Sequence, residues 1–235
     1  PRVDRCLAIT PADEARLREI APAARTAVVP GVVATEEYRA ARPPRPGDDP
    51  LVVATGTFSF PPTGDGLVHF VEQVWPRVLT AAPRARFRAI GHCPEWLRDR
   101  LAGRAGVEVT GRVASVEEHL DGAHALAVPL LAGSGMRMKI LEAMAWQVPV
   151  VTTAVGCEGI AVEDGRHLRV ADGPEAMAAA LLEVAGDAGR AEALRREGRR
   201  FVEDHYSLAA AAQATQRIYG ECLERRADPP GRRAP

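Results

Sequence analysis

The chain has 235 residues, with 30 basic and 31 acidic side chains and a formal net charge of −1. This length suits one large domain or two modest ones, and the balanced charge argues against a nucleic-acid binder, whose basic face normally shows in the total. No apolar run reaches the roughly 18–20 residues of a membrane-spanning helix. The four cysteines lie far apart without metal-binding spacing, so we expect reduced thiols in a cytoplasmic protein, with peripheral association at the inner membrane face as an alternative.

The first part of the chain predicts one short helix between two apolar runs. Thr10 offers a capping hydroxyl and Pro11 suits the first turn, so we expect a helix that extends to about Ile20. Short apolar runs flank this helix at 7–9 and 26–29. The segment 41–50 is rich in proline and charge without periodicity, which predicts a linker.

From residue 51 onward, short apolar runs alternate with helical patterns. The runs predict buried strands at 51–56, 86–91, 106–110, 124–130, 148–153 and, more weakly, 167–171. Helical patterns cover 65–81, 94–103, 115–122, 135–146, 174–186, 189–204 and 207–224. This alternation indicates right-handed βαβ crossovers. The predicted fold class is therefore α/β, with a doubly wound, Rossmann-like parallel sheet covered on both faces.

Glycines stand where these predicted strands end, which is the edge at which such sheets bind ligands. They are Gly56, Gly91, Gly111, Gly133, Gly135 and Gly156. The first strand does not run into G-x-G-x-x-G, and the chain has no G-x-x-x-x-G-K-[ST], so neither a dinucleotide cofactor nor a P-loop is predicted. No spacing of histidines or paired carboxylates suggests a metal site.

Lys139 is the only lysine in the chain and lies near the predicted start of the 135–146 helix, close to Arg137. Two cations at a helix start are locally unfavourable unless an anion lies against the exposed backbone N–H groups, so this arrangement predicts a phosphate site. The spacing is equally compatible with a surface pair between Lys139 and Glu142. Both side chains share one face of the helix, where the carboxylate of Glu142 is suited to accept both hydroxyls of a ribose.

An ordered set of motifs runs through the chain. It comprises Ala54-Thr-Gly-Thr57, Val109-Thr-Gly-Arg-Val113, Pro129-Leu130, Gly133-Ser-Gly135, Lys139-Ile-Leu-Glu-Ala-Met-Ala145, Pro149-Val-Val-Thr152 and Glu158-Gly159. With these motifs, the chain from residue 51 to about Tyr206 resembles the C-terminal, donor-binding half of the GT-B glycosyltransferases of group-1 or family-4 type. Residues 1–40 resemble the tail of that family's N-terminal, acceptor-binding domain, most of which is absent from this chain.

The resemblance implies three parts: residues 1–47 as a remnant of the acceptor domain with the linker, 48–226 as a nucleotide-sugar donor-binding domain, and 227–235 as a flexible tail. It implies a retaining, metal-independent transfer of a sugar from a nucleotide-diphosphate sugar, with no cofactor, this chain supplying the donor-binding half. The acceptor is open among a glycan, a lipid-linked sugar and a small molecule. No nucleic-acid partner is expected, and no catalytic residue is assigned.

The resemblance also implies a set of donor-binding residues. They are Gly56, Thr57, Arg112, Val113, Ser134, Gly135, Met136, Arg137, Lys139, Leu141 and Glu142. By analogy, Glu142 binds the ribose, residues 135–139 hold the diphosphate, and Arg112 with Val113 lines the base.

The chain departs from the family pattern at three points. Ser134 replaces the first of two glutamates, the loop 58–65 offers no cation, and Gln147 replaces a glycine after the helix. Two alternatives stay open: a non-catalytic nucleotide-sugar binding module and a nucleotide-sugar epimerase of the same architecture. A third is a doubly wound scaffold with an unrelated small ligand.

Overall fold

The computed structural model describes residues 3–227 and contains two parallel sheets. The small sheet pairs β1 (Cys6–Ala8) with β2 (Thr26–Val28), and α1 (Pro11–Ile20) connects them. The large sheet has the strand order β5-β4-β3-β6-β7-β8. Its strands are β3 (Leu51–Thr55), β4 (Arg86–Ile90), β5 (Val107–Gly111), β6 (Ala125–Val128), β7 (Val150–Thr152) and β8 (Arg169–Val170). All pairs are parallel and the order reverses between β3 and β6, which confirms the predicted doubly wound sheet.

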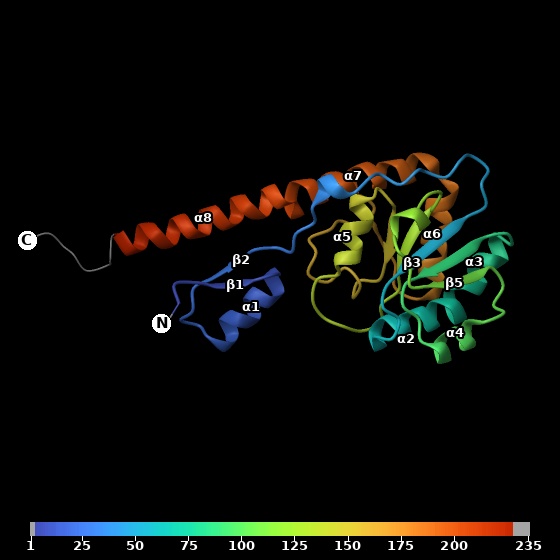
Figure 1. The fold of residues 1–235 in the computed structure, drawn as a ribbon, viewed down its shortest axis with the longest axis horizontal. Helices are drawn as coiled ribbons and strands as arrows, with labels where there is room; N and C mark the ends of the chain where they lie inside the picture. The colour runs from blue at the N-terminus through green and yellow to red at the C-terminus, as the bar shows by residue number, and fades with distance from the viewer. Residues whose placement is uncertain (1–2, 228–235) are drawn as a thin grey trace, which may run out of the picture.

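Helices cover both faces of this sheet (Figure 1). They are α2 (Pro61–His69), α3 (Trp75–Ala81), α4 (Glu95–Leu101), α5 (Met138–Ala145), α6 (Pro174–Gly186) and α7 (Ala188–Tyr206). The last helix, α8 (Leu208–Ala227), follows α7 and extends beyond the sheet. Alternate residues of β3 enter two separate cores, because successive side chains of a strand point to opposite faces. Val52 and Ala54 pack in the core that contains Phe70 and Phe87, whereas Val53 packs in the core that contains Ile140.

Three predicted helices differ from the structure. The segment 115–122 forms only a 3₁₀ turn, η3 (Glu117–His119), and its chain then turns at Gly122, which has a positive φ of 78°. The predicted 135–146 helix begins at Met138, because Gly133 and Gly135 adopt φ values of 132° and 86° that no α-helix contains. The predicted 65–81 helix is longer than expected: α2 and α3 are joined by a π-helical stretch, η2 (Phe70–Val74).

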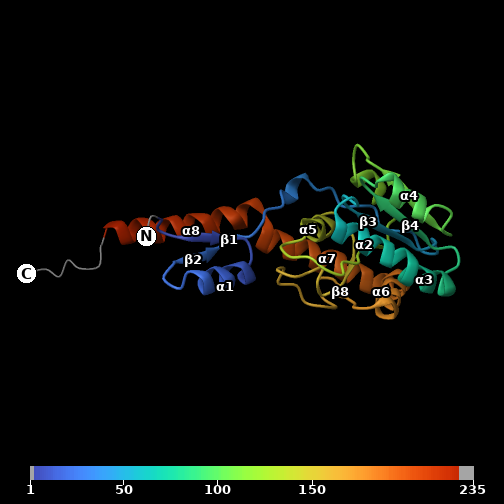
Figure 2. The same ribbon diagram turned by 90° about the horizontal axis from the view of Figure 1, so that it is seen from below.

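The N-terminal unit, which consists of β1, α1 and β2, lies beside α8, the last helix. Figures 1 and 2 show α8 extending away from the large sheet alongside β1, α1 and β2. An ion pair of 2.8 Å between Arg5 and Glu221 joins the two. No helix within residues 3–227 is both long and apolar enough to cross a bilayer. The predicted flexible tail spans residues 227–235. Except for Ala227, the last residue of α8, it lies outside the described residues.

Candidate functional site

A cavity of about 970 Å³ opens at the carboxyl ends of the central strands, at the point where the strand order reverses. Its walls come from the loops after β3, β4, β5 and β6 and from the start of α5. The predicted residues that line it are Gly56, Thr57, Arg112, Val113, Ser134, Met136, Arg137, Lys139 and Glu142. The fold therefore brings together side chains that are up to 86 positions apart in the sequence, from residue 56 to residue 142.

Two predicted residues do not line the cavity. Gly135 lies in the turn between Ser134 and Met136, and its carbonyl oxygen accepts a hydrogen bond from the Arg137 guanidinium. Leu141 is a correction: its side chain is fully buried in the core with Ile140, on the side of α5 that packs against the sheet. A side chain in that position has no access to a ligand.

Lys139 turns its ammonium toward the end of β3. Its Nζ donates a hydrogen bond of 2.8 Å to the carbonyl oxygen of Thr55. Gly56 leaves room for this contact, since a Cβ atom there would lie 2.9 Å from the same Nζ. Burial, with the nearby positive charge of Arg137, lowers the pKa of Lys139 to about 8. The alternative surface pair is wrong: no ion pair joins Lys139 to Glu142 in the described part of the chain.

The backbone also approaches itself closely at this edge of the sheet. Gly91, at the end of β4, has a φ of 131°, and a Cβ atom on it would lie 2.1 Å from the carbonyl oxygen of Gly56. No side chain fits in that gap. Glycine at this position therefore permits the close approach of the ends of β3 and β4 beside the cavity.

The turn before α5 is closed by Arg137. Its guanidinium donates to the carbonyl oxygens of Ser134 and Gly135, the residue itself precedes the first helical position, and no side chain caps the helix. In that turn the N–H of Ile140 donates to the carbonyl oxygen of Arg137 at 2.9 Å, whereas no side chain caps the N–H groups of Met138 and Lys139, which lie beside two cations. An uncapped helix start with adjacent cations is suited to an anion.

Glu142 lies one turn further along α5, half-buried in the cavity wall. Burial raises the pKa of its carboxyl group, while the positive charge of Lys139 and a hydrogen bond from the Tyr38 side chain oppose this effect. A carboxylate with its other lone pairs free is a strong acceptor for hydroxyl groups. The wall thus presents a cation for an anionic group and an acceptor for hydroxyls, one helical turn apart.

Sequence reasoning missed three residues of this site. Trp146 lines the cavity four positions after Glu142, a helical spacing that predicts the same face. His92 lines it directly after Gly91, at a strand end that the sequence had marked. No sequence pattern points to Tyr38, because it lies 104 positions before Glu142 in a segment without periodicity.

A second cavity, of about 730 Å³, lies between the N-terminal unit and α7. Its charged side chains are of both signs, with Arg166 and Arg200 opposed by Glu197 and Asp204. It is away from the strand ends and shows no preference for an anion. Residues 3–227 also contain no group of three or more His, Cys, Asp and Glu side chains able to hold a metal ion, and metal independence stays a prediction.

The sheet order and the strand-end cavity define a Rossmann-like domain with a ligand site at its topological switch point. A family model described as Glycosyl transferases group 1 matches residues 49–187, more than half of the chain. The chain belongs to this family, which confirms the resemblance seen in the sequence. An uncharacterised 44.6 kDa protein in the cps region of Klebsiella pneumoniae is 22% identical over 163 residues, which cover 66% of this chain and 42% of that protein.

Solved structures share the same fold. Sucrose-phosphate synthase from Thermosynechococcus elongatus superposes with a TM-score of 0.71 at 21% identity, over 94% of this chain and 59% of that one. The pneumococcal O-GlcNAc transferase GtfA, solved with UDP and GlcNAc, superposes with a TM-score of 0.70 at 16% identity, over 94% of this chain and 46% of that one. TarM from S. aureus, in a complex that includes UDP, superposes with a TM-score of 0.75 at 14% identity, over 93% of this chain and 44% of that one. The fold is therefore that of GT-B glycosyltransferases, and the chain spans about half the length of these relatives.

Proposed function

We propose that this chain supplies the donor-binding half of a glycosyltransferase that takes its sugar from a nucleotide-diphosphate sugar. The observation that carries the proposal is the pair of Lys139 and Glu142 on one cavity wall. A largely buried ammonium and a half-buried carboxylate face the same space without pairing with each other. Such an arrangement is costly unless a ligand satisfies both groups.

A nucleoside diphosphate satisfies both. Its pyrophosphate lies at the uncapped start of α5, where Lys139 and Arg137 compensate its charge. Its ribose hydroxyls donate to Glu142, and its base lies against Arg112 and Val113, which also line the cavity. UDP is the favoured nucleotide, because TarM and GtfA were both solved with UDP.

The same groups act in the transfer step. When the bond between the anomeric carbon and the pyrophosphate oxygen breaks, negative charge grows on the diphosphate. Lys139, Arg137 and the first N–H groups of α5 are fixed where that charge develops, which is electrostatic stabilisation without a metal ion. Retention at the anomeric carbon is carried over from the family resemblance, and a cytoplasmic location from the dispersed cysteines.

A thermal-shift panel of UDP-, GDP- and dTDP-sugars tests the proposal. A ligand at 100 times its dissociation constant stabilises the fold by about 2.7 kcal/mol, a shift that is readily measured. We expect one nucleotide class to stabilise the wild type, and Glu142→Gln to lose most of that shift while it stays folded. If no nucleotide sugar shifts the wild type, or if the variant responds like the wild type, the donor-site assignment is wrong.

Turnover separates the alternatives. We expect the chain to bind the donor but to transfer little, because it spans about half the length of its relatives and the acceptor is expected to bind outside it. Interconversion of the donor sugar with no acceptor present would instead identify an epimerase. Measurable transfer by this chain to a sugar acceptor would show that it is complete for catalysis.

A further inference from the structure

Trp146 continues the row of side chains that α5 presents to the cavity. Lys139, Glu142 and Trp146 all line it, at helical spacings that place them on one face. The N–H of Trp146 donates to the carbonyl oxygen of Glu142 at 2.9 Å, so the helical spacing continues to this residue. A rise of about 1.5 Å per residue separates the three by roughly 4.5 and 6 Å along the axis. A nucleoside diphosphate carries its pyrophosphate, ribose and base in the same order, so the indole lies where the base is expected.

Apolar side chains accompany Trp146 in the cavity wall. Val113 and Val116 line the cavity with it, and all three are partly buried and pack against the same core. The two faces of a base are apolar, and an aromatic ring offers them the largest contact. Trp146 is half-buried, whereas Trp75, which fills the core, is only 1% exposed. Part of the indole is therefore accessible to a ligand.

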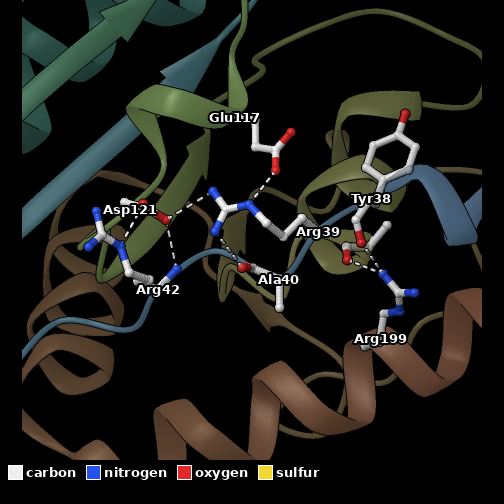
Figure 3. Close-up of polar contacts among 8 residues, drawn as sticks. Tyr38, Arg39, Ala40, Arg42, Glu117, Asp121 and Arg199 are labelled. Atoms are coloured by element: carbon white, nitrogen blue, oxygen red, sulfur yellow. Dashed lines mark hydrogen bonds and ion pairs between the residues drawn. The ribbon is translucent and has the colours of Figure 1, made fainter.

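A short stretch of the preceding chain connects Trp146 with Val116. The backbone N–H of Ala41 donates to the Trp146 carbonyl oxygen at 2.8 Å. Arg39 forms an ion pair of 2.8 Å with Glu117, the residue that follows Val116 (Figure 3). The Cα atoms of Arg39 and Ala41 are at most about 7 Å apart, because only two peptide units separate them. Trp146 and Val116 therefore border the same end of the cavity.

The same stretch supports the indole. The ring of Tyr38 packs against that of Trp146 with a centroid distance of 4.9 Å, and Tyr38 itself does not line the cavity. Arg199 on α7 donates to the carbonyl oxygen of Tyr38 at 3.1 Å and also to that of Ala145 (Figure 3). The backbones on which both rings stand are thus fastened to one guanidinium. An indole held in place before a ligand arrives loses less entropy on binding.

We propose that Trp146 is the nucleobase-stacking residue of the donor site. The inference rests on the proposed function and adds the group on which the base lies, beyond the ribose at Glu142 and the pyrophosphate at Lys139. The edges of the base are left to the loop that carries Arg112 and Val113. Stacking tolerates any base, because every base has an aromatic face, so Trp146 contributes affinity and not the choice of base.

Ligands with and without a base measure this contact. UMP and ribose 5-phosphate differ only in the base, and calorimetry, by displacement against UDP where binding is weak, gives their dissociation constants. We expect Trp146→Leu to weaken UDP and UMP binding about tenfold, and Trp146→Phe to weaken it only about two- to threefold, since phenylalanine keeps an aromatic face. The affinity for ribose 5-phosphate should change little. Both variants keep an apolar side chain and the backbone hydrogen bonds of residue 146, so the fold is expected to persist.

Tryptophan fluorescence observes the contact directly. The chain has three tryptophans, of which Trp75 is buried in the core and Trp96 is 60% exposed on α4. UDP should quench the emission of the wild type, and this quenching should disappear in Trp146→Leu. Trp96→Leu is the matched control, because it makes the same substitution at a residue that does not line the cavity. It should leave both the quenching and the affinity for UDP unchanged.

The outcomes are distinct. Wild-type affinity for UDP in a folded Trp146→Leu variant, or UDP binding to the wild type without quenching, would overturn the inference and leave the proposed function standing. Equal weakening of UMP and ribose 5-phosphate would also overturn it, because the indole would then act on the ribose or on the fold. A loss in Trp146→Phe as large as in Trp146→Leu would exclude stacking. If the wild type bound no nucleoside diphosphate, the proposed function itself would be wrong and the inference with it.

Discussion

The ammonium of Lys139 lies 2.8 Å from the carbonyl oxygen of Thr55, so the first turn of α5 is joined to the last residue of β3. This contact spans the switch point of the sheet, because β3 and β6 are the strands between which the order reverses. A single backbone acceptor compensates only part of the cost of burying the charge. The residual cost is what a pyrophosphate group would relieve.

Replacing Lys139 with methionine should therefore change binding and stability in opposite directions. The loss of a charged donor is expected to weaken nucleoside-diphosphate binding by about ten- to a hundredfold. The free protein is expected to become more stable, because a buried charge without an acidic partner is removed. Calorimetry and chemical denaturation measure the two effects, and Arg16→Met, on the exposed side of α1, controls for the loss of one positive charge. A variant that is both weaker in binding and less stable would contradict this explanation.

Nucleotide binding should depend on pH around the pKa of Lys139. This pKa of about 8 means that the ammonium loses its proton above pH 8, so affinity should fall between pH 8 and 10. Binding at pH 8.5 should take up a proton, which calorimetry detects as a dependence on the ionisation enthalpy of the buffer. In Lys139→Met, the part of the proton uptake that this ammonium supplies should vanish.

The ammonium of Lys139 also makes the free energy of unfolding depend on pH. Its folded pKa of about 8 lies below the usual lysine value of 10.5, so between these values the unfolded chain binds more protons. The stability of the wild type relative to Lys139→Met should therefore rise as the pH increases from 8 to 10. A difference that is independent of pH would mean that the lysine is not buried in solution.

Gln147 is the only non-glycine residue in the described part of the chain with a positive φ, at 58°. Gln147 follows the end of α5. Its N–H donates to the carbonyl oxygen of Met144, and the N–H of Val148 donates to that of Ala143, which completes a Schellman motif. Gln147→Gly should raise the free energy of unfolding by about 1 kcal/mol, because glycine adopts this conformation without the steric cost. Gln147→Ala keeps a Cβ atom and should be nearly neutral in the same denaturation experiment.

Arg199→Ala should release residues 35–42, the segment that leads into the linker, from the rest of the domain. It removes the donor to the carbonyl oxygens of Tyr38, Thr35 and Ala145, which is expected to cost about 2–3 kcal/mol of stability. Trypsin should then cut more readily after Arg39, which is followed by Ala40. Arg200→Ala is the neighbouring control, since the Arg200 side chain makes an exposed ion pair with Asp204 at 3.6 Å and no other among residues 3–227. Equal protection of the linker in both variants would show that Arg199 does not hold it.

Much of the fold was predictable because it depends on local pattern. The apolar runs of the large sheet, together with glycines at the strand ends, predicted the strands and the edge on which the cavity opens. The start of α5 was harder, because Met136 and Arg137 fit the helical period while the glycines before them adopt positive φ. The error at Leu141 came from the family analogy, although the periodicity of α5 already placed that residue on the apolar face.

The contribution of the linker could not be predicted. Tyr38 packs against Trp146 beside the cavity, and Arg199, more than 160 positions further along the chain, donates to its carbonyl oxygen. Neither residue belongs to a motif, and no periodic pattern connects them. Contacts of this kind depend on tertiary packing between segments that are far apart in the sequence.

Because Lys139 is the only lysine in the sequence, a sample labelled with ¹³C-lysine gives one side-chain signal. Following that signal by NMR from pH 6 to 11 measures its pKa directly, without and with UDP. We predict a pKa of about 8 in the free protein and a clear increase when the nucleotide binds. A pKa near 10.5 that UDP does not change would show that this ammonium is exposed to solvent and holds no phosphate.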